Sequence, residues 1–230
     1  MIVLEFCGPG GCGKTTVCDL VEAAFREQDL CVKNLQKRQR PQKTIEKMRL
    51  KARLFFRWFA PSNLRLGMAI CWFAFLNQFI QPIRWANRII ELQDRLEHER
   101  EAELVVLDEG FVQFLSSLAY DRKIERGLDV PVHLLKNRVY VNGRDLVVII
   151  RCGANEETTI ARLINRHRKS DRNIHEDKRV MQALISRRCE NIDQIIKRIA
   201  PSMTFFCPTE DQVEAVETIM QKVAPFIGKR

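Results

Sequence analysis

Residues 8–15 constrain the fold of this chain most, because they read Gly-Pro-Gly-Gly-Cys-Gly-Lys-Thr between a β-rich run, Ile2–Phe6, and a helical run, Thr16–Gln28. Their spacing fits G-x-x-x-x-G-K-[ST], the pattern of a loop that turns consecutive backbone N–H groups onto a phosphate chain. The start of the following helix adds unpaired donors and a partial positive charge. The order of strand, loop and helix therefore predicts a phosphate-binding loop.

Within this loop, different side chains are expected to contact different parts of a nucleotide. Lys14 would reach the β- and γ-phosphates of ATP, and the Thr15 hydroxyl would reach Mg²⁺. Cys12 lies at a helix start, which can lower the pKa of a thiol, but we favour the alternative that it fills a small-residue position. The residues predicted to bind ATP are Gly8, Pro9, Gly10, Gly11, Cys12, Gly13, Lys14, Thr15 and Thr16.

Four further runs are expected to be strands. These are Cys31–Leu35, Leu104–Leu107, Leu146–Arg151 and Met203–Cys207. The third and fourth strands along the chain are continuous apolar runs, typical of strands buried on both faces of a parallel sheet. With helices between the strands, the sequence predicts an α/β P-loop NTPase fold, a five-stranded parallel sheet sandwiched by helices. We expect one domain over 1–230 with a helical insertion at about 36–103.

The insertion offers candidate acceptor contacts. Leu66–Leu76 is almost wholly apolar and predicts a buried helix, and Pro82 is expected to kink or break this helix. Unless Pro82 breaks it, five residues at helical spacing share one face that could stack on and hydrogen-bond a base; the alternative is an ordinary polar helix face. These residues are Phe73, Asn77, Gln81, Arg84 and Arg88.

Asp108 and Glu109 follow the buried run Leu104–Leu107, as acids do in a Walker B strand. Asp108 at a strand end can hold Mg²⁺ through its water shell, and either carboxylate could accept a proton from an acceptor hydroxyl. The metal ligands predicted from the sequence are therefore Thr15 and Asp108.

An arginine-rich segment at about 162–176 predicts a lid. Arg162, Arg166, Arg168 and Arg172 lie within eleven residues. Such cations could neutralise charge on a transferring phosphoryl group and exclude water when the segment closes. The alternative is a charged, exposed helix end. The predicted catalytic residues are Lys14, Asp108, Glu109, Arg166, Arg168 and Arg172.

Together these stretches resemble the thymidylate kinase branch of the nucleoside and nucleotide kinases. Residues 2–16 are similar to that family's first strand and phosphate loop, and 166–172 resemble its lid, where arginines precede an Asp-Arg pair. Residues 116–120, Ser-Ser-Leu-Ala-Tyr, resemble its Ser-x-x-Ala-Tyr stretch, and Phe205–Cys207 its last strand, whose following loop lies beside the donor adenine. The resemblance implies ATP, Mg²⁺ and kinase chemistry.

The departures from this family concern the acceptor. Where the family usually has Asp-Arg after the third strand, with the arginine on the acceptor phosphate, this chain has Asp108-Glu109. The acidic residue common in the family's loop is replaced by Pro9-Gly10, and Arg38-Gln39-Arg40-Pro41 only loosely resembles its Arg-Glu-Pro-Gly-Gly stretch. Thymidylate is therefore not carried over as the substrate.

Charge is unevenly distributed along the chain. Of a net charge of +9, the segment Lys37–Arg57 carries +8, with nine basic residues and one acid. Such a segment favours a phosphate-bearing partner or an anionic surface, unless it is simply a solvated face. No run reaches the roughly 18 apolar residues of a membrane span. Because the first predicted strand begins at Ile2, we expect no signal peptide. The eight scattered cysteines favour a cytoplasmic location.

We therefore expect an ATP- and Mg²⁺-dependent small-molecule kinase acting on a nucleotide or nucleoside. One alternative is a nucleic-acid-directed P-loop protein, either a polynucleotide kinase or a nucleic-acid-stimulated ATPase. The other is a non-catalytic, nucleotide-switched protein at an anionic membrane surface. A homodimer is compatible with each of them.

Overall fold

The computed structural model describes most of the chain. Its described residues are 1–35, 58–77, 82–99, 101–119, 124, 126–137, 146–168, 178–199, 201 and 203–227, without the side chains of 166–168. The basic segment Lys37–Arg57 lies outside the described residues.

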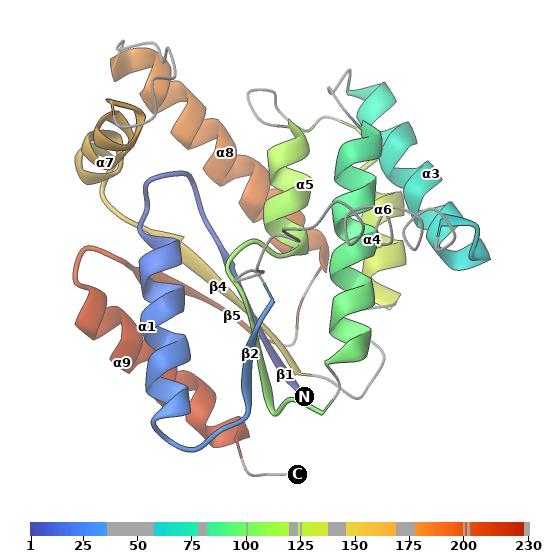
Figure 1. The fold of residues 1–230 in the computed structure, drawn as a ribbon. Helices are drawn as coiled ribbons and strands as arrows, with labels where there is room; N and C mark the ends of the chain where they lie inside the picture. The colour runs from blue at the N-terminus through green and yellow to red at the C-terminus, as the bar shows by residue number, and fades with distance from the viewer. Residues whose placement is uncertain are drawn as a thin grey trace.

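Five parallel strands form the central sheet, as the sequence predicts (Figure 1). They are β1 (Ile2–Cys7), β2 (Val32–Asn34), β3 (Leu104–Leu107), β4 (Leu146–Gly153) and β5 (Met203–Pro208). Their order is β2-β3-β1-β4-β5, and in the central register Leu4 pairs with both Val106 and Val148. The connection after β1 leads to one side of the sheet, toward β2, and the connection after β3 leads to the other side, toward β4. The carboxyl ends of β1 and β3 therefore flank the switch point where parallel α/β sheets bind ligands.

Helices connect the strands. They are α1 (Lys14–Arg26), α3 (Pro61–Leu76), α4 (Pro82–His98), α5 (Phe111–Ala119), α6 (Asp129–Leu135), α7 (Glu156–Arg168), α8 (Lys178–Ile199) and α9 (Gln212–Val223), followed by the 3-10 turn η2 (Ala224–Phe226). Among the described helices, none combines the length and apolar composition that a bilayer-crossing segment requires.

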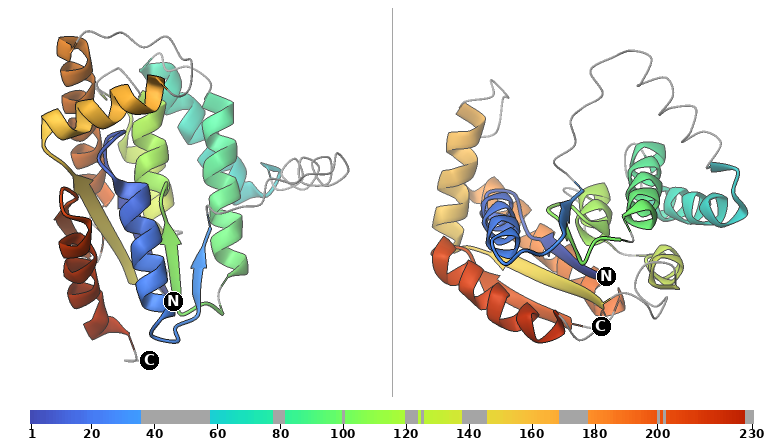
Figure 2. Two further views of the ribbon diagram at one scale, coloured as in Figure 1. Left: turned by 60° about the vertical axis from the view of Figure 1, so that its left-hand side comes forward. Right: turned by 60° about the horizontal axis from the view of Figure 1, so that its bottom comes forward.

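The sheet separates two hydrophobic cores, because side chains alternate between its faces along each strand. Val3, Val105 and Val147 point to the face covered by α4, α5 and α8, whereas Leu4 and Val148 point to the face covered by α1 and α9 (Figures 1 and 2). Both faces are thus buried, which explains why β3 and the first five residues of β4, Leu146–Ile150, are apolar without interruption.

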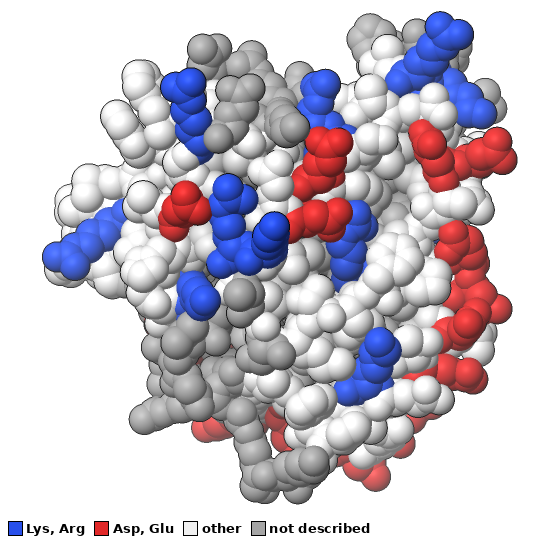
Figure 3. Space-filling view, turned by 180° about the vertical axis from the view of Figure 1, so that it is seen from behind, with Lys and Arg blue, Asp and Glu red and all other residues white. Residues whose placement is uncertain are grey.

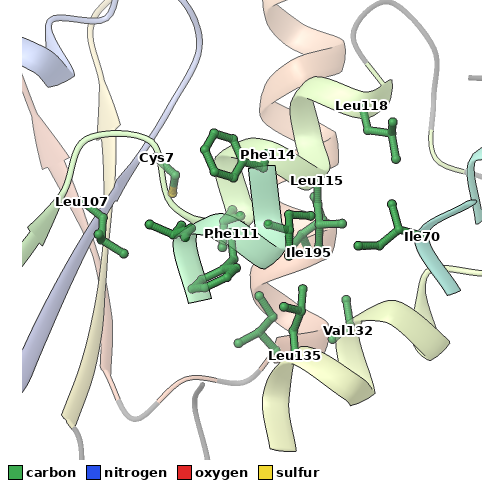
Figure 4. Close-up of a cluster of buried hydrophobic side chains, with 14 of the residues drawn as sticks. Cys7, Ile70, Leu107, Phe111, Phe114, Leu115, Leu118, Val132, Leu135 and Ile195 are labelled. Carbon is green, nitrogen blue, oxygen red and sulfur yellow. The ribbon is translucent and has the colours of Figure 1, made fainter. Parts of the chain in front are cut away.

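The larger core joins the sheet to the helical part of the chain (Figure 4). In it, Cys7 and Leu107 from the sheet lie toward the aromatic rings of Phe111 and Phe114 on α5. Farther out, the same cluster takes in Ile195 of α8, Val132 and Leu135 of α6, and Ile70 of α3. The helices α3 and α4, which lie between β2 and β3 in sequence, are therefore anchored to the sheet through α5.

The prediction that Leu66–Leu76 is a buried helix is correct for only one face of α3. Leu66, Ile70 and Phe73 are buried, but Met68 and Trp72 are exposed by 54% and 57%. A helix that is apolar all round is normally buried all round, and hydrophobic periodicity could not indicate which face would remain open.

Candidate phosphate-binding site

The glycine loop lies between the end of β1 and the start of α1, at the predicted position. Gly11 and Gly13 have φ angles of 80° and 89°, in the left-handed region that favours glycine. A Cβ on Gly11 would stand 2.7 Å from Thr159 O and 2.9 Å from Leu163 Cγ, so α7 packs directly on the loop. The loop is thus confined from outside as well as shaped by its own backbone.

Two buried polar side chains, both missed at the sequence level, fix the loop. Gln113 of α5 accepts a 3.1 Å hydrogen bond from the backbone N–H of Gly8. Behind the loop, the Thr209 hydroxyl lies within hydrogen-bonding distance of the carbonyl oxygens of Cys12 and Gly153. The single polar residue inside the apolar run 111–115 was the available signal for Gln113, whereas Thr209 is an ordinary loop threonine by sequence.

Cys12 is fully buried in the loop. Burial raises the pKa of its thiol above the ordinary value, despite the opposing effect of Lys14. A raised pKa suppresses the thiolate, which is the reactive form of cysteine. The structure therefore supports a small-residue packing role for Cys12.

Lys14, Thr15 and Thr16 form the first turn of α1, and this turn contacts the end of β3. The Thr15 hydroxyl donates a 2.9 Å hydrogen bond to Asp108 Oδ2. Asp108 Oδ1 is buried and has no hydrogen-bond partner among the described residues. The two predicted metal ligands are thus adjacent, and one buried carboxylate oxygen remains available for a ligand.

Burial also raises the pKa of Asp108 above the ordinary value for an aspartate. Lys14 and the hydrogen bond from Thr15 oppose this rise, while the negative charges of Glu109 and Asp19 add to it. In the described part of the chain, no group of three or more His, Cys, Asp and Glu side chains could hold a metal ion. The pair fits Mg²⁺, which usually takes one or two protein ligands together with water and phosphate oxygens.

Glu109 is exposed at the site, whereas a different acid supports the segment after β3. Glu5 of β1 is fully buried and accepts a 2.6 Å hydrogen bond from the backbone N–H of Val112, at the start of α5. A Cβ on Gly110 would stand 2.3 Å from Glu5 Cδ, so only glycine fits there. Glu5 thus holds the start of α5, and with it the turn that carries Asp108.

Arg162 of α7 points at the loop and was not among the predicted catalytic residues. Its Nη2 lies 3.4 Å from Thr209 O, and its Nη1 lies 2.9 Å from where a Cβ on Gly13 would stand. Nη1 is buried without a hydrogen-bond partner among the described residues. A guanidinium held in this way against a phosphate-binding loop can pair with an anion.

The predicted lid is only partly described. Residues 162–168 form the end of α7, but the side chains of Arg166 and Arg168 lie outside the described residues, as does the whole of Arg172. Their catalytic assignment stays a prediction.

The condition for an acceptor-reading face is not met, because α3 ends at Leu76 and α4 begins at Pro82, in agreement with the expected helix break. Pro82 begins a new helix, so Phe73 and Asn77 belong to α3 while Arg84 and Arg88 belong to α4. Gln81 lies outside the described residues. Phe73 is fully buried in the core and cannot stack on a base. The Asn77 amide nitrogen lies 2.8 Å from the carbonyl oxygens of both Phe73 and Arg126, so this side chain instead ends α3.

The parallel sheet, its order and the loop at the end of β1 define a P-loop kinase fold. No protein-family model matches the chain, and no curated protein matches its sequence. Among solved structures, deoxyadenosine kinase from M. mycoides with bound dATP aligns at a TM-score of 0.50 and 15% identity, covering 96% of this chain and 99% of that one. Shikimate kinase from Acinetobacter baumannii in complex with shikimate aligns at a TM-score of 0.47 and 14% identity, covering 99% of this chain and 95% of that one. At these identities the likeness extends to the fold alone.

Proposed function

We propose that the chain is an ATP- and Mg²⁺-dependent phosphotransferase, a small-molecule kinase of the thymidylate kinase-like branch. The observation that carries this proposal is the contact between Thr15 and Asp108 beside the glycine loop. It joins a hydroxyl and a carboxylate, the two ligand types that P-loop proteins use for Mg²⁺. Oδ1 of Asp108, buried and without a hydrogen-bond partner among the described residues, provides a position for water or metal.

Each part of the site has a role in this proposal. The loop amides and Lys14 hold the β- and γ-phosphates. Thr15 and Asp108 would hold Mg²⁺, which neutralises charge on the phosphate oxygens during transfer. Gln113 and Thr209 keep the loop in its binding conformation through Gly8 and Cys12.

Cations from α7 and from the sequence that follows it complete the donor side. Arg162 pairs with the bound nucleotide through Nη1, the atom for which the described residues supply no hydrogen-bond partner. Arg166, Arg168 and Arg172 neutralise charge on the transferring group as the 162–176 lid closes and excludes water.

The proposed acceptor is a nucleotide or nucleoside, oriented by Asp108 or Glu109. Glu109 is exposed, so its carboxylate can meet an incoming molecule. Such an acid accepts a hydrogen bond from a hydroxyl and repels a phosphate. The contrast between nucleosides and their monophosphates is therefore the informative comparison.

An assay of ADP release over nucleosides, nucleoside monophosphates and other small hydroxyl compounds tests the proposal. The wild-type chain should show acceptor-stimulated turnover that requires Mg²⁺, and Lys14→Ala should lose it while keeping its melting temperature. Turnover stimulated only by DNA or RNA, with binding that weakens steeply in salt, would indicate the nucleic-acid-directed alternative. ATP binding without transfer to any acceptor would indicate the nucleotide-switched one.

A further inference from the structure

Helix α3 is apolar on two opposite faces. Its inner face, with Leu66, Ile70 and Phe73, is buried in the core. On the opposite side, four large apolar residues follow at spacings of four, four and three, and so share one face. They are Leu64, Met68, Trp72 and Phe75, and we call them the outer stripe of α3.

The outer stripe is the main concentration of exposed apolar side chains in the described part of the chain. Of thirteen large hydrophobic residues exposed there, six lie between Phe59 and Leu76. Phe75 is exposed by 72%, and its ring stacks on that of Trp72 with 5.7 Å between centroids. Figure 2 shows α3 at the outer edge of the molecule, away from the sheet. Contiguous patches of this kind mark interaction surfaces.

The described charged side chains of α3 and of the first two turns of α4, which packs against it, are all cationic. Between Glu46 and Glu91 the sequence has no acidic residue, while it has eight Lys or Arg residues. Arg65 is exposed on α3 itself, and Arg57 precedes the helix by four positions. By contrast, acidic side chains line the edge of the molecule formed by α9 and α7, on the right in Figure 3.

We propose that the outer stripe of α3 rests on an anionic lipid surface. A helix face with Trp, Phe, Leu and Met enters the boundary between headgroups and acyl chains, and neighbouring Lys and Arg residues pair with anionic headgroups. Because the inner face of α3 stays packed in the core, only its outer stripe can enter the lipid, and the helix lies in the plane of the interface. Trp72 and Phe75 are its anchors, since aromatic rings favour this depth.

Charge argues against a second copy of this chain as the occupant. A two-fold interface brings the same patch of both subunits together. It would place the exposed Arg65 beside one outer stripe opposite the Arg65 of the other, and like charges across an interface repel. An anionic bilayer satisfies both the apolar stripe and the cations.

The test is co-sedimentation of the full-length chain with phosphatidylcholine vesicles with and without phosphatidylserine. The wild-type chain should bind the phosphatidylserine vesicles more tightly, and salt should weaken this binding. Trp72→Ser/Phe75→Ser should weaken it by roughly tenfold or more, because two large side chains no longer enter the interface. Val213→Ser is the matched control: Val213 is 67% exposed, but it lies on α9 across the sheet.

A second measurement does not depend on how the double variant folds. Lipids with brominated acyl chains should quench the tryptophan fluorescence of the wild type. Trp72→Phe should bind equally well with little quenching, because Trp58 and Trp85 pack against the core. Absence of vesicle binding at low salt, or equal binding by wild type and double variant, would overturn the proposal. A dimer in light scattering that the double variant abolishes, without vesicle binding, would assign the stripe to a second copy.

Discussion

The Thr15 hydroxyl donates a 2.9 Å hydrogen bond to Asp108 Oδ2, so the first turn of α1 and the end of β3 meet at one point. The two residues are 93 positions apart in sequence. They come together because β1 and β3 are parallel neighbours, with Glu5 opposite Leu107 in the register. The glycine loop after β1 and the acid after β3 therefore emerge at the same edge of the sheet.

Replacing Thr15 by alanine removes the hydroxyl and leaves Asp108 Oδ2 without this donor. We expect Mg²⁺-dependent turnover to fall by roughly 10²-fold, the usual scale for losing one positioned polar group of a catalytic site. Steady-state kinetics over a Mg²⁺ titration measure this. Thr15→Ser keeps the hydroxyl and should retain most activity; if alanine and serine variants behave alike, the hydroxyl has no role in metal binding.

Asp108→Asn should stabilise the fold at neutral pH while abolishing activity. Burial raises the pKa of Asp108, so the folded protein binds this proton more tightly than the unfolded chain does. Stability contributed by this group is therefore lost as pH rises from the ordinary aspartate pKa, about 3.9, through the raised folded value. Asparagine carries no charge and avoids that loss.

Thermal unfolding across pH measures the effect. The melting temperature of Asp108→Asn should exceed that of the wild type at neutral pH. This difference should shrink toward zero as the pH of the experiment is lowered toward the ordinary aspartate pKa. A variant that is less stable at neutral pH would mean that the contacts of Asp108 with Lys14 and Thr15 outweigh its desolvation.

The sheet could be predicted from the sequence because its signals are local. The apolar runs of β3 and β4 indicate strands buried on both faces, and the glycine loop indicates which strand is central to the site. The strand boundaries shift by no more than two residues: β2 begins and ends one residue inside the expected Cys31–Leu35, and β4 extends to Gly153 instead of Arg151. The pairing of Thr15 with Asp108 follows from the same parallel order.

The supports of the site could not be predicted in the same way, because they are long-range contacts of single residues. Gln113 lies 105 positions from Gly8, and Thr209 lies 197 from Cys12. No periodicity relates them. The acceptor-reading face does not form for a local reason. Pro82 starts α4, so Phe73 and Asn77 are not on the same helix as Arg84 and Arg88.

Gly11→Ala should damage the loop, whereas Gly10→Ala should not. Alanine at residue 11 would need a φ near 80° and would crowd Thr159 O at 2.7 Å, so we expect a loss of about 1–3 kcal/mol in the free energy of unfolding. A Cβ on Gly10 would have Leu163 Cδ2 as its nearest atom, at 3.3 Å, and that atom is the end of a flexible side chain. Urea denaturation and ATP titration of both variants make the comparison, and equal losses would contradict the confinement of Gly11 by α7.

Arg162→Met should weaken nucleotide binding without weakening the fold. In the structure, Nη1 is buried against the loop without a partner among the described residues, so the guanidinium contributes to the fold only the long 3.4 Å contact of Nη2 with Thr209 O. A bound nucleotide would supply the missing acceptor, and a hydrogen bond to a charged group is worth roughly 1.5–3 kcal/mol. The affinity for ATP should therefore fall by roughly 10- to 100-fold.

Calorimetric titration with ATP and thermal unfolding of the nucleotide-free chain separate binding from structure. Arg162→Lys keeps the charge but loses the planar, forked guanidinium. Its affinity for ATP should therefore lie between those of Arg162→Met and the wild type. Arg198→Met is the control, because Arg198 of α8 forms an ion pair of 2.9 Å with Asp129 of α6 and not with a residue of the loop. If Arg162→Met lowers the melting temperature and leaves ATP affinity unchanged, Arg162 only joins α7 to the loop after β5.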